Sequence, residues 1–157
     1  MEIKKLQDVI TDLIVFWKKQ NILICPTSEQ KISEFQKNRY FKFPADFLEF
    51  YSKVDGMKTL YPNENDHEGF LFYPLDAVIS VSNEFGDSAL INKDQIFLFA
   101  DYMHKSWWYG FELISADNYV IGIFSDKNSF KPITNSLADF IEMYMKDSPK
   151  LYDYLSS

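Results

Sequence analysis

The residues of this sequence that could carry chemistry are two histidines, one cysteine and 23 acidic side chains. His67 stands between Asp66 and Glu68, and an imidazole with carboxylate oxygens is a donor set that zinc accepts. Three adjacent side chains in a loop do not define a tetrahedral geometry, however. A solvated loop tip is the alternative interpretation, and it is the one that we expect.

Cys25 could be a nucleophile only with a base beside it. Neither His67 nor His104 has a sequence context that places it there, and the apolar stretch NILICP suits a buried structural thiol. Asp101 and Glu112 could meet as a general acid–base pair, but a chain with so many acids always offers some pair of this kind. No G-x-S-x-G, H-E-x-x-H or phosphate-binding glycine loop occurs. We therefore expect no enzymatic activity, no catalytic residue, no metal and no cofactor.

The charge of the chain is acidic and unevenly spread. Residues 1–44 hold 8 basic and 5 acidic side chains, whereas residues 45–157 hold 8 basic and 18 acidic ones, and the net charge is −7. Such a field repels nucleic-acid phosphates and anionic lipid and attracts a basic protein; solubility alone is the alternative explanation. The first residues mix acids with apolar side chains, unlike a signal peptide, and no apolar run reaches the roughly 18 residues of a membrane span. We expect a cytoplasmic protein that binds neither nucleic acid nor membrane.

Acidic residues in the predicted loops are the candidates for meeting a basic partner. Each of them alone could simply be solvated, but as a set they could oppose the surface with which a nuclease grips phosphates. Charge pairing of this type raises association rates by about 10–10³ and fixes orientation. The candidates are Asp55, Glu64, Asp66 and Glu68 around the first predicted hairpin, Glu84 and Asp87 in the middle loop, and Asp101 beside His104.

The predicted strand at residues 107–114 offers an aromatic candidate. Alternate residues of a strand point to opposite faces, and the set that begins with Trp107 is wholly apolar, so we assign that face to the core. Trp108 and Glu112 share the other face. If that face is wet, Trp108 is a half-exposed aromatic anchor beside a carboxylate, a residue type favoured in interfaces. If a helix covers it, Trp108 belongs to the core.

Two helices are predicted before residue 40. Apolar residues at steps of three and four predict a one-faced helix over residues 3–19. A second helix is expected to start after Pro26, where Thr27 can cap it and Gln30 can reach back to the cap. This second helix is expected to end near Asn38.

A third helix has both a start and a stop signal. Pro44 suits the first helical position, where no N–H donor is needed, and Gly56 can take the left-handed conformation that ends a helix. The predicted buried face is formed by Phe47, Leu48, Phe50, Tyr51 and Val54.

Beyond residue 57 the pattern becomes that of strands. Segments 59–61 and 69–73 flank a polar loop and predict a hairpin, and residues 74–92 indicate a short helical turn followed by a loop. The segments 95–100, 107–114 and 119–124 are predicted strands, and a final helix begins near Ser136.

This order of elements predicts one α+β domain over residues 1–157. We expect a single, mostly antiparallel sheet packed with N-terminal helices and a C-terminal helix.

The order and spacing of these elements resemble the SUKH superfamily, named in part for the Smi/Knr cell-wall regulators of fungi. The resemblance covers about residues 24–150. It is carried by the Pro-led helix with Phe43, Pro44, Phe47, Phe50 and Gly56, by the segments QIFLFA and WWYGFEL, and by the C-terminal segment SLADFIEMYM. In this last segment Leu137 stands in place of the family's first Phe.

The resemblance implies a binding function without chemistry. Similar bacterial proteins are mostly immunity proteins that bind and neutralise a toxin domain, often a nuclease or a nucleic-acid deaminase, encoded by a neighbouring gene. We therefore expect a cognate, basic toxin protein as the partner, blocked sterically by carboxylates. A regulatory scaffold of the Smi/Knr type is the alternative, and a small-ligand binder that uses the aromatic sheet is a third.

Overall fold

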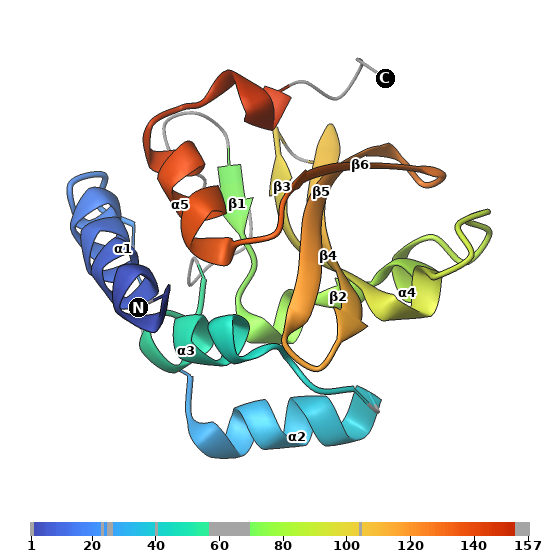
Figure 1. Cartoon of the computed structure of the whole chain (residues 1–157), viewed down its shortest axis with the longest axis horizontal. Coiled ribbons are helices and arrows are strands. Elements are labelled where there is room, and N and C mark those ends of the chain that lie inside the picture. Colours follow the sequence, from blue (N-terminus) through green and yellow to red (C-terminus); the bar gives the residue numbers. More distant parts are fainter. Residues whose placement is uncertain are drawn as a thin grey trace.

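The computed structural model describes residues 2–22, 24, 27–39, 41–56, 70–103 and 105–152, with side chains from Lys5 onward. Its centre is an antiparallel sheet with the strand order β1–β3–β4–β5–β6, in which β2 also pairs with β3 (Figure 1). The strands are β1 (Phe70–Phe72), β2 (Ile79–Ser80), β3 (Ile96–Tyr102), β4 (Trp107–Ser115), β5 (Asn118–Asp126) and β6 (Ser129–Thr134).

Three helices, α1, α3 and α5, lie on one side of this sheet, and the short α4 lies on the other (Figure 1). In the same view α2 lies beneath α3. The predicted α+β class, with N-terminal and C-terminal helices packed on an antiparallel sheet, is thus confirmed. The helices are α1 (Glu2–Lys18), α2 (Glu29–Arg39), α3 (Ala45–Lys53), α4 (Val81–Glu84) and α5 (Leu137–Met145), with 3₁₀ turns η1 (Leu75–Ala77), η2 (Lys93–Gln95) and η3 (Pro149–Tyr152).

The sheet is built around β3. All residues of this strand up to Asp101 are buried, and the strand pairs with β1 and β2 on one edge and with β4 on the other. Apolar side chains on both faces are typical of a strand covered on both sides. The central strand predicted at residues 95–100 is confirmed.

Aromatic rings fill the space between the sheet and the helices. The Phe47 ring of α3 stacks on the Phe111 ring of β4, with centroids 4.1 Å apart. Aromatic pairs contribute about 0.5–1.5 kcal/mol each beyond the area that they bury. Trp17 of α1 is fully buried, and its Nε1–H donates to the Tyr144 hydroxyl of α5 at 2.8 Å. Helices distant in sequence are therefore fixed to one sheet face and to each other.

The third helix begins and ends close to its predicted signals. Pro44 immediately precedes α3, and the Ala45 N–H donates to Asp117 Oδ1 at 2.9 Å. The helix ends at Lys53, and Gly56 then adopts φ +59°. Leu48 differs from the prediction, because it is only half-buried and lies beside the fully inward stripe of α3.

The cap of α2 is not the predicted one. Ser28 Oγ, and not Thr27, accepts a hydrogen bond from the Lys31 N–H at 3.1 Å. Gln30 does not reach back to the cap, since its Nε2 donates to Glu34 Oε1 at 3.2 Å. Thr27 is buried instead, and its Oγ1 has no hydrogen-bond partner within the described part of the chain. Adjacent hydroxyl residues compete for one capping position, and here burial removes Thr27 from that competition.

Two strands were not predicted. β2 has only two residues, and β6 contains Pro132, which normally weakens a prediction of strand. β6 lies at the sheet edge beside β5, where a missing N–H is tolerated. The first strand of the predicted hairpin, residues 59–61, lies outside the described residues, as does Cys25. No helix in the described ranges has the length and apolar character needed to span a bilayer.

We predict that Gly56→Ala lowers the free energy of unfolding by at least about 2 kcal/mol, because a side chain strains the left-handed backbone. A Cβ atom at this position would also lie 2.2 Å from the Tyr73 carbonyl oxygen. Gly86→Ala is the matched control, since its Cβ would meet no atom nearer than the Ser82 carbonyl oxygen at 3.7 Å. Urea unfolding of both variants tests this, and equal stabilities would contradict it.

Candidate partner-binding surface

Several predicted site residues lie outside the described part of the chain. These are Glu64, Asp66, Glu68 and His104, together with His67 of the candidate metal loop. Among the residues that the structure does describe, no three His, Cys, Asp or Glu side chains are grouped so that they could hold a metal ion. The remaining candidates form two groups, namely acids whose hydrogen bonds stabilise the fold and residues that lie at the surface.

Asp55 and Asp101 serve the fold. Asp55 is half-buried and its Oδ1 accepts a hydrogen bond from the Leu75 N–H at 2.6 Å, which joins the end of α3 to η1. Asp101 is 0% exposed, and its Oδ2 accepts from the Tyr73 hydroxyl at 2.7 Å. A fully buried carboxylate cannot face a protein partner, so Asp101 is a structural residue and not part of a partner-binding surface.

Trp108 lies on the sheet face opposite α3 and α5. Its environment is intermediate between the two alternatives that the sequence left open, an exposed anchor and a core residue. It is half-buried, and the Phe85 ring meets it edge-on at 4.8 Å. Its Nε1–H is buried and has no acceptor among the described residues. The segment after α4 therefore covers most of this ring, and Trp108 offers a partner little free area.

The surface acids on this face are already paired. Glu84 Oε2 lies 3.5 Å from Lys105 Nζ, and Glu112 Oε2 accepts from Asn92 Nδ2 at 2.6 Å. The first contact joins α4 to the segment that precedes β4, and the second joins the loop between α4 and β3 to β4. The charge of Glu84 is thus partly neutralised by Lys105, whereas Glu112 keeps its charge because the Asn92 amide is neutral.

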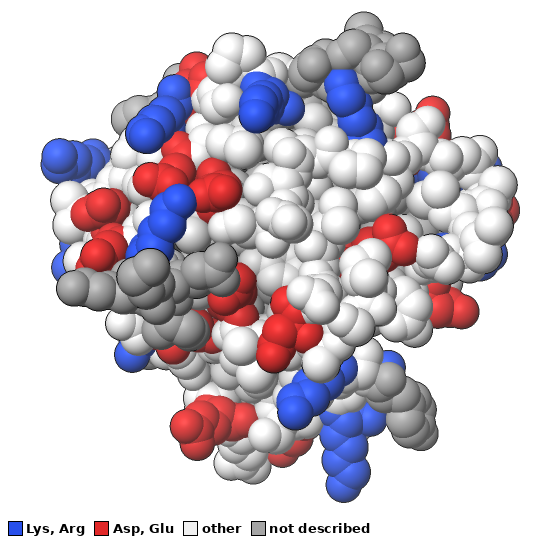
Figure 2. Space-filling model, in the orientation of Figure 1, with Lys and Arg blue, Asp and Glu red and all other residues white. Residues whose placement is uncertain are grey.

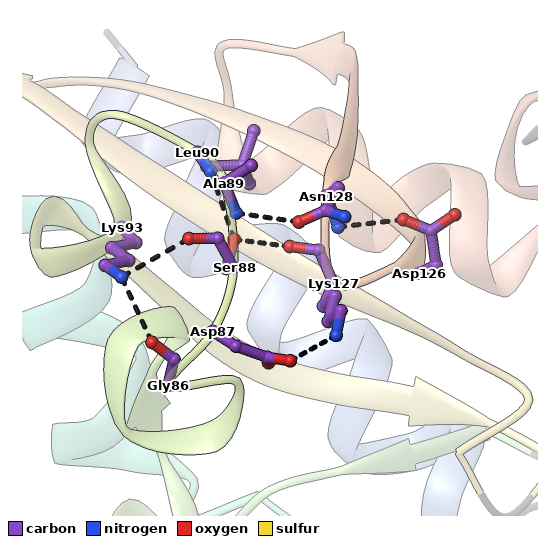
Figure 3. A network of polar contacts seen from close by, with 9 residues as sticks. All are labelled: Gly86, Asp87, Ser88, Ala89, Leu90, Lys93, Asp126, Lys127 and Asn128. Carbon is purple, nitrogen blue, oxygen red and sulfur yellow. Dashed lines mark hydrogen bonds and ion pairs between the residues drawn. The ribbon is translucent and has the colours of Figure 1, made fainter.

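Asp87 belongs to a network that fixes the same loop to the turn between β5 and β6 (Figure 3). Its carboxylate forms an ion pair with Lys127, while the Ala89 N–H donates to Asn128 Oδ1 at 2.7 Å. Within the loop, Lys93 Nζ donates to the Gly86 carbonyl oxygen at 3.1 Å. The loop is therefore ordered by polar contacts.

Acidic side chains gather over α1, α3 and α5 on the face shown in Figure 2. Asp139 and Glu142 of α5 both bond to the Lys5 ammonium of α1, at 2.6 and 3.2 Å. These hydrogen bonds raise the pKa of Lys5 above its ordinary value. Asp8 and Asp12 of α1 are exposed and form no ion pair with a described residue.

A groove between α2 and α3 brings together residues that sequence reasoning did not select. Its volume is about 520 Å³. Glu29 lines it from α2 and Glu49 from α3, and neither forms an ion pair within the described ranges. The sequence feature that could have indicated this groove is Leu48, an apolar residue beside the main inward stripe of α3. The lining residues are Glu29, Ile32, Ser33, Gln36, Ala45, Leu48, Glu49 and Ser52.

We predict a pKa difference that tests the loop network. The hydrogen bond from Lys127 holds the pKa of the Asp87 carboxyl below its ordinary value of 3.8. Lys127→Gln should therefore raise this pKa, as measured by NMR titration of the carboxyl carbon, whereas the distant Lys146→Gln should not. Because the folded-state pKa is lowered, the stabilisation is complete above the unfolded value and is lost as pH falls through the folded value. Equal pKa values in all three proteins would exclude the ion pair.

Removal of the Tyr73 hydroxyl tests the structural role of Asp101. Tyr73→Phe takes away one donor to a buried carboxylate, so we expect the free energy of unfolding to fall by about 1.5–3 kcal/mol. Tyr152→Phe, which removes an exposed hydrogen bond to Asp147, should cost no more than about 1 kcal/mol. Denaturant unfolding measures both, and a Tyr73→Phe variant as stable as the native chain would contradict this assignment.

Comparison with known proteins agrees with the fold described above. No match was found among the curated proteins with which the chain was compared. The family model described as SMI1 / KNR4 family (SUKH-1) matches residues 26–143, which is well over half of the chain and extends from just before α2 into α5. The resemblance drawn from the Pro-led helix and the aromatic strands is thus confirmed. The chain belongs to the SMI1/KNR4 family (SUKH-1).

Proposed function

We propose that this chain is an intracellular immunity protein that binds and neutralises one cognate toxin domain without chemistry of its own. The observation that carries the proposal is membership of the SMI1/KNR4 family, since similar bacterial proteins mostly have this role. The toxin class that fits best is a nuclease or a nucleic-acid deaminase, because such enzymes present basic surfaces to phosphates.

The charge of the chain supports this class of partner. The net charge of −7 favours encounter with a basic protein, and carboxylates over the helices can occupy the positions where phosphates would bind. Inhibition is then steric, because the bulk of the domain covers the nucleic-acid channel of the toxin. No bond is made or broken in this mechanism.

The packing of the chain also suits an inhibitor. The helix α3 is fixed to the sheet by stacked rings, and α1 is fixed to α5 by the buried hydrogen bond from Trp17 to Tyr144. A surface held in this way is preorganised, so little side-chain or backbone freedom is lost on binding. A preformed surface of this kind is typical of inhibitor complexes that form with little backbone movement.

A regulatory scaffold of the Smi/Knr type is the second candidate, and the same family match supports it. Gene context separates the two functions, since a toxin gene beside this one favours immunity and an isolated gene favours a scaffold. A scaffold would bind its partner without protecting cells from a toxin.

We predict that co-expression with the product of the adjacent gene yields a complex that co-purifies and that protects the cells. The association rate should fall about tenfold when the salt concentration rises from about 50 to 500 mM, because attraction between exposed charges is screened. Surface plasmon resonance measures this rate. If no complex forms and the cells are not protected, the immunity function is rejected.

A further inference from the structure

Two helices face each other across the α2–α3 groove with the same residue spacing. On each helix the lining positions are i, i+3, i+4 and i+7, which form one continuous helical stripe. The stripes diverge enough to leave a groove of about 520 Å³ between them. They are Glu29, Ile32, Ser33 and Gln36 on α2, and Ala45, Leu48, Glu49 and Ser52 on α3.

The base of the groove is apolar. Ile32 is 6% exposed and Leu48 is half-buried, so both lie deep between the helices. Glu29 and Ser33 are exposed and form the upper wall on the α2 side. An occupant therefore meets aliphatic carbon at the bottom and polar atoms at the rim, an arrangement typical of a recognition groove.

The rim carries negative charge only. Glu29 and Glu49 are the charged residues that line the groove within the described ranges, and no lysine or arginine lies among the lining residues. Glu49 also borders a second hollow of about 320 Å³ between α1 and α3, where Gln7 Nε2 donates to it at 3.4 Å. Glu49 therefore lines both depressions, and Lys53 lines the second one, which is thus not purely acidic.

We propose that the α2–α3 groove binds a basic amphipathic helix of the partner protein. Apolar residues of that helix, at steps of three and four, would pack on Ile32 and Leu48, and its lysines or arginines would pair with Glu29 and Glu49. This arrangement is the helix-in-groove mode of recognition. For the identity of the partner, the inference rests on the proposed immunity function.

The charge of the groove favours a basic helix over two other occupants, an acidic segment and a second copy of this chain. An acidic segment would be repelled by both rim carboxylates, and like charges brought together in an interface cost several kcal/mol. A second copy of this chain also carries a net charge of −7, so self-association through the groove is unfavourable for the same reason. A basic segment gains from both carboxylates.

The probe is a synthetic 16-residue helical peptide with leucines at steps of three and four and lysines elsewhere, and a second peptide has glutamates in place of the lysines. Each peptide is titrated into the ¹⁵N-labelled chain. The lysine peptide should shift the amide resonances of residues 29–36 and 45–52, and the glutamate peptide should not. Glu49→Lys should weaken this binding about tenfold, the effect expected of an opposed charge at an interface rim.

Two further variants separate groove binding from general attraction. Glu34→Lys makes the same charge change on the side of α2 away from the groove, so it should alter affinity less than about twofold. Ser33→Trp keeps the charge and fills the groove, so it should abolish the shifts. Circular dichroism of each variant verifies that it is folded.

The proposal is overturned if the lysine peptide causes no shifts at millimolar concentration, if the shifts map elsewhere, or if Glu34→Lys and Glu49→Lys weaken binding equally. The same variants can be tested on a co-purified partner. Unchanged affinity of Ser33→Trp for that partner would reject the groove and leave the immunity function standing. Peptide binding in the groove without any co-purified toxin would reject the immunity function instead.

Discussion

The stack of Phe47 on Phe111, 4.1 Å apart, joins α3 to the middle of the sheet, and the rest of the arrangement depends on it. With Phe47, Phe50 and Tyr51 turned inward, the helical period of 3.6 residues leaves Glu49 turned away from the core. The same period aligns Ala45, Leu48 and Ser52 with Glu49 toward α2. The contact that fixes the core therefore also fixes one wall of the proposed binding groove.

The elements with strong local signals were predictable from the sequence. α3 has a proline before it and a glycine after it, and β3 is apolar on both faces, so local chemistry alone determines them. β6 could not be predicted in the same way, because a strand with Pro132 is stable only at an edge beside β5, which is a tertiary property. The capping residue of α2 could not be predicted either, because the choice depends on the burial of Thr27, which is also a tertiary property.

The candidate site was less predictable than the fold, because it depends on which side chains meet. Glu84 and Asp87 looked like free loop acids, but Lys105 and Lys127 pair with them. Glu112 looked like an acid on an exposed strand face, but Asn92 donates a hydrogen bond to it. Asp101 looked like a surface residue beside a histidine, yet the burial of the whole strand encloses it. Glu29 and Glu49 were unremarkable in the sequence, since only the packing of α2 beside α3 makes them neighbours across a groove. Acids that order a loop thus lie on one side of the molecule, whereas Glu29 and Glu49, which form no ion pair with a described residue, line a groove between helices.

Hydrogen–deuterium exchange on the complex with a co-purified partner protein tests the proposed groove most directly, because it maps the contact surface without any substitution. We predict slower exchange in α2 and α3 on complex formation, with exchange in the loop between α4 and β3 unchanged. Slower exchange confined to that loop and to the β5–β6 turn, with α2 and α3 unaffected, would contradict it.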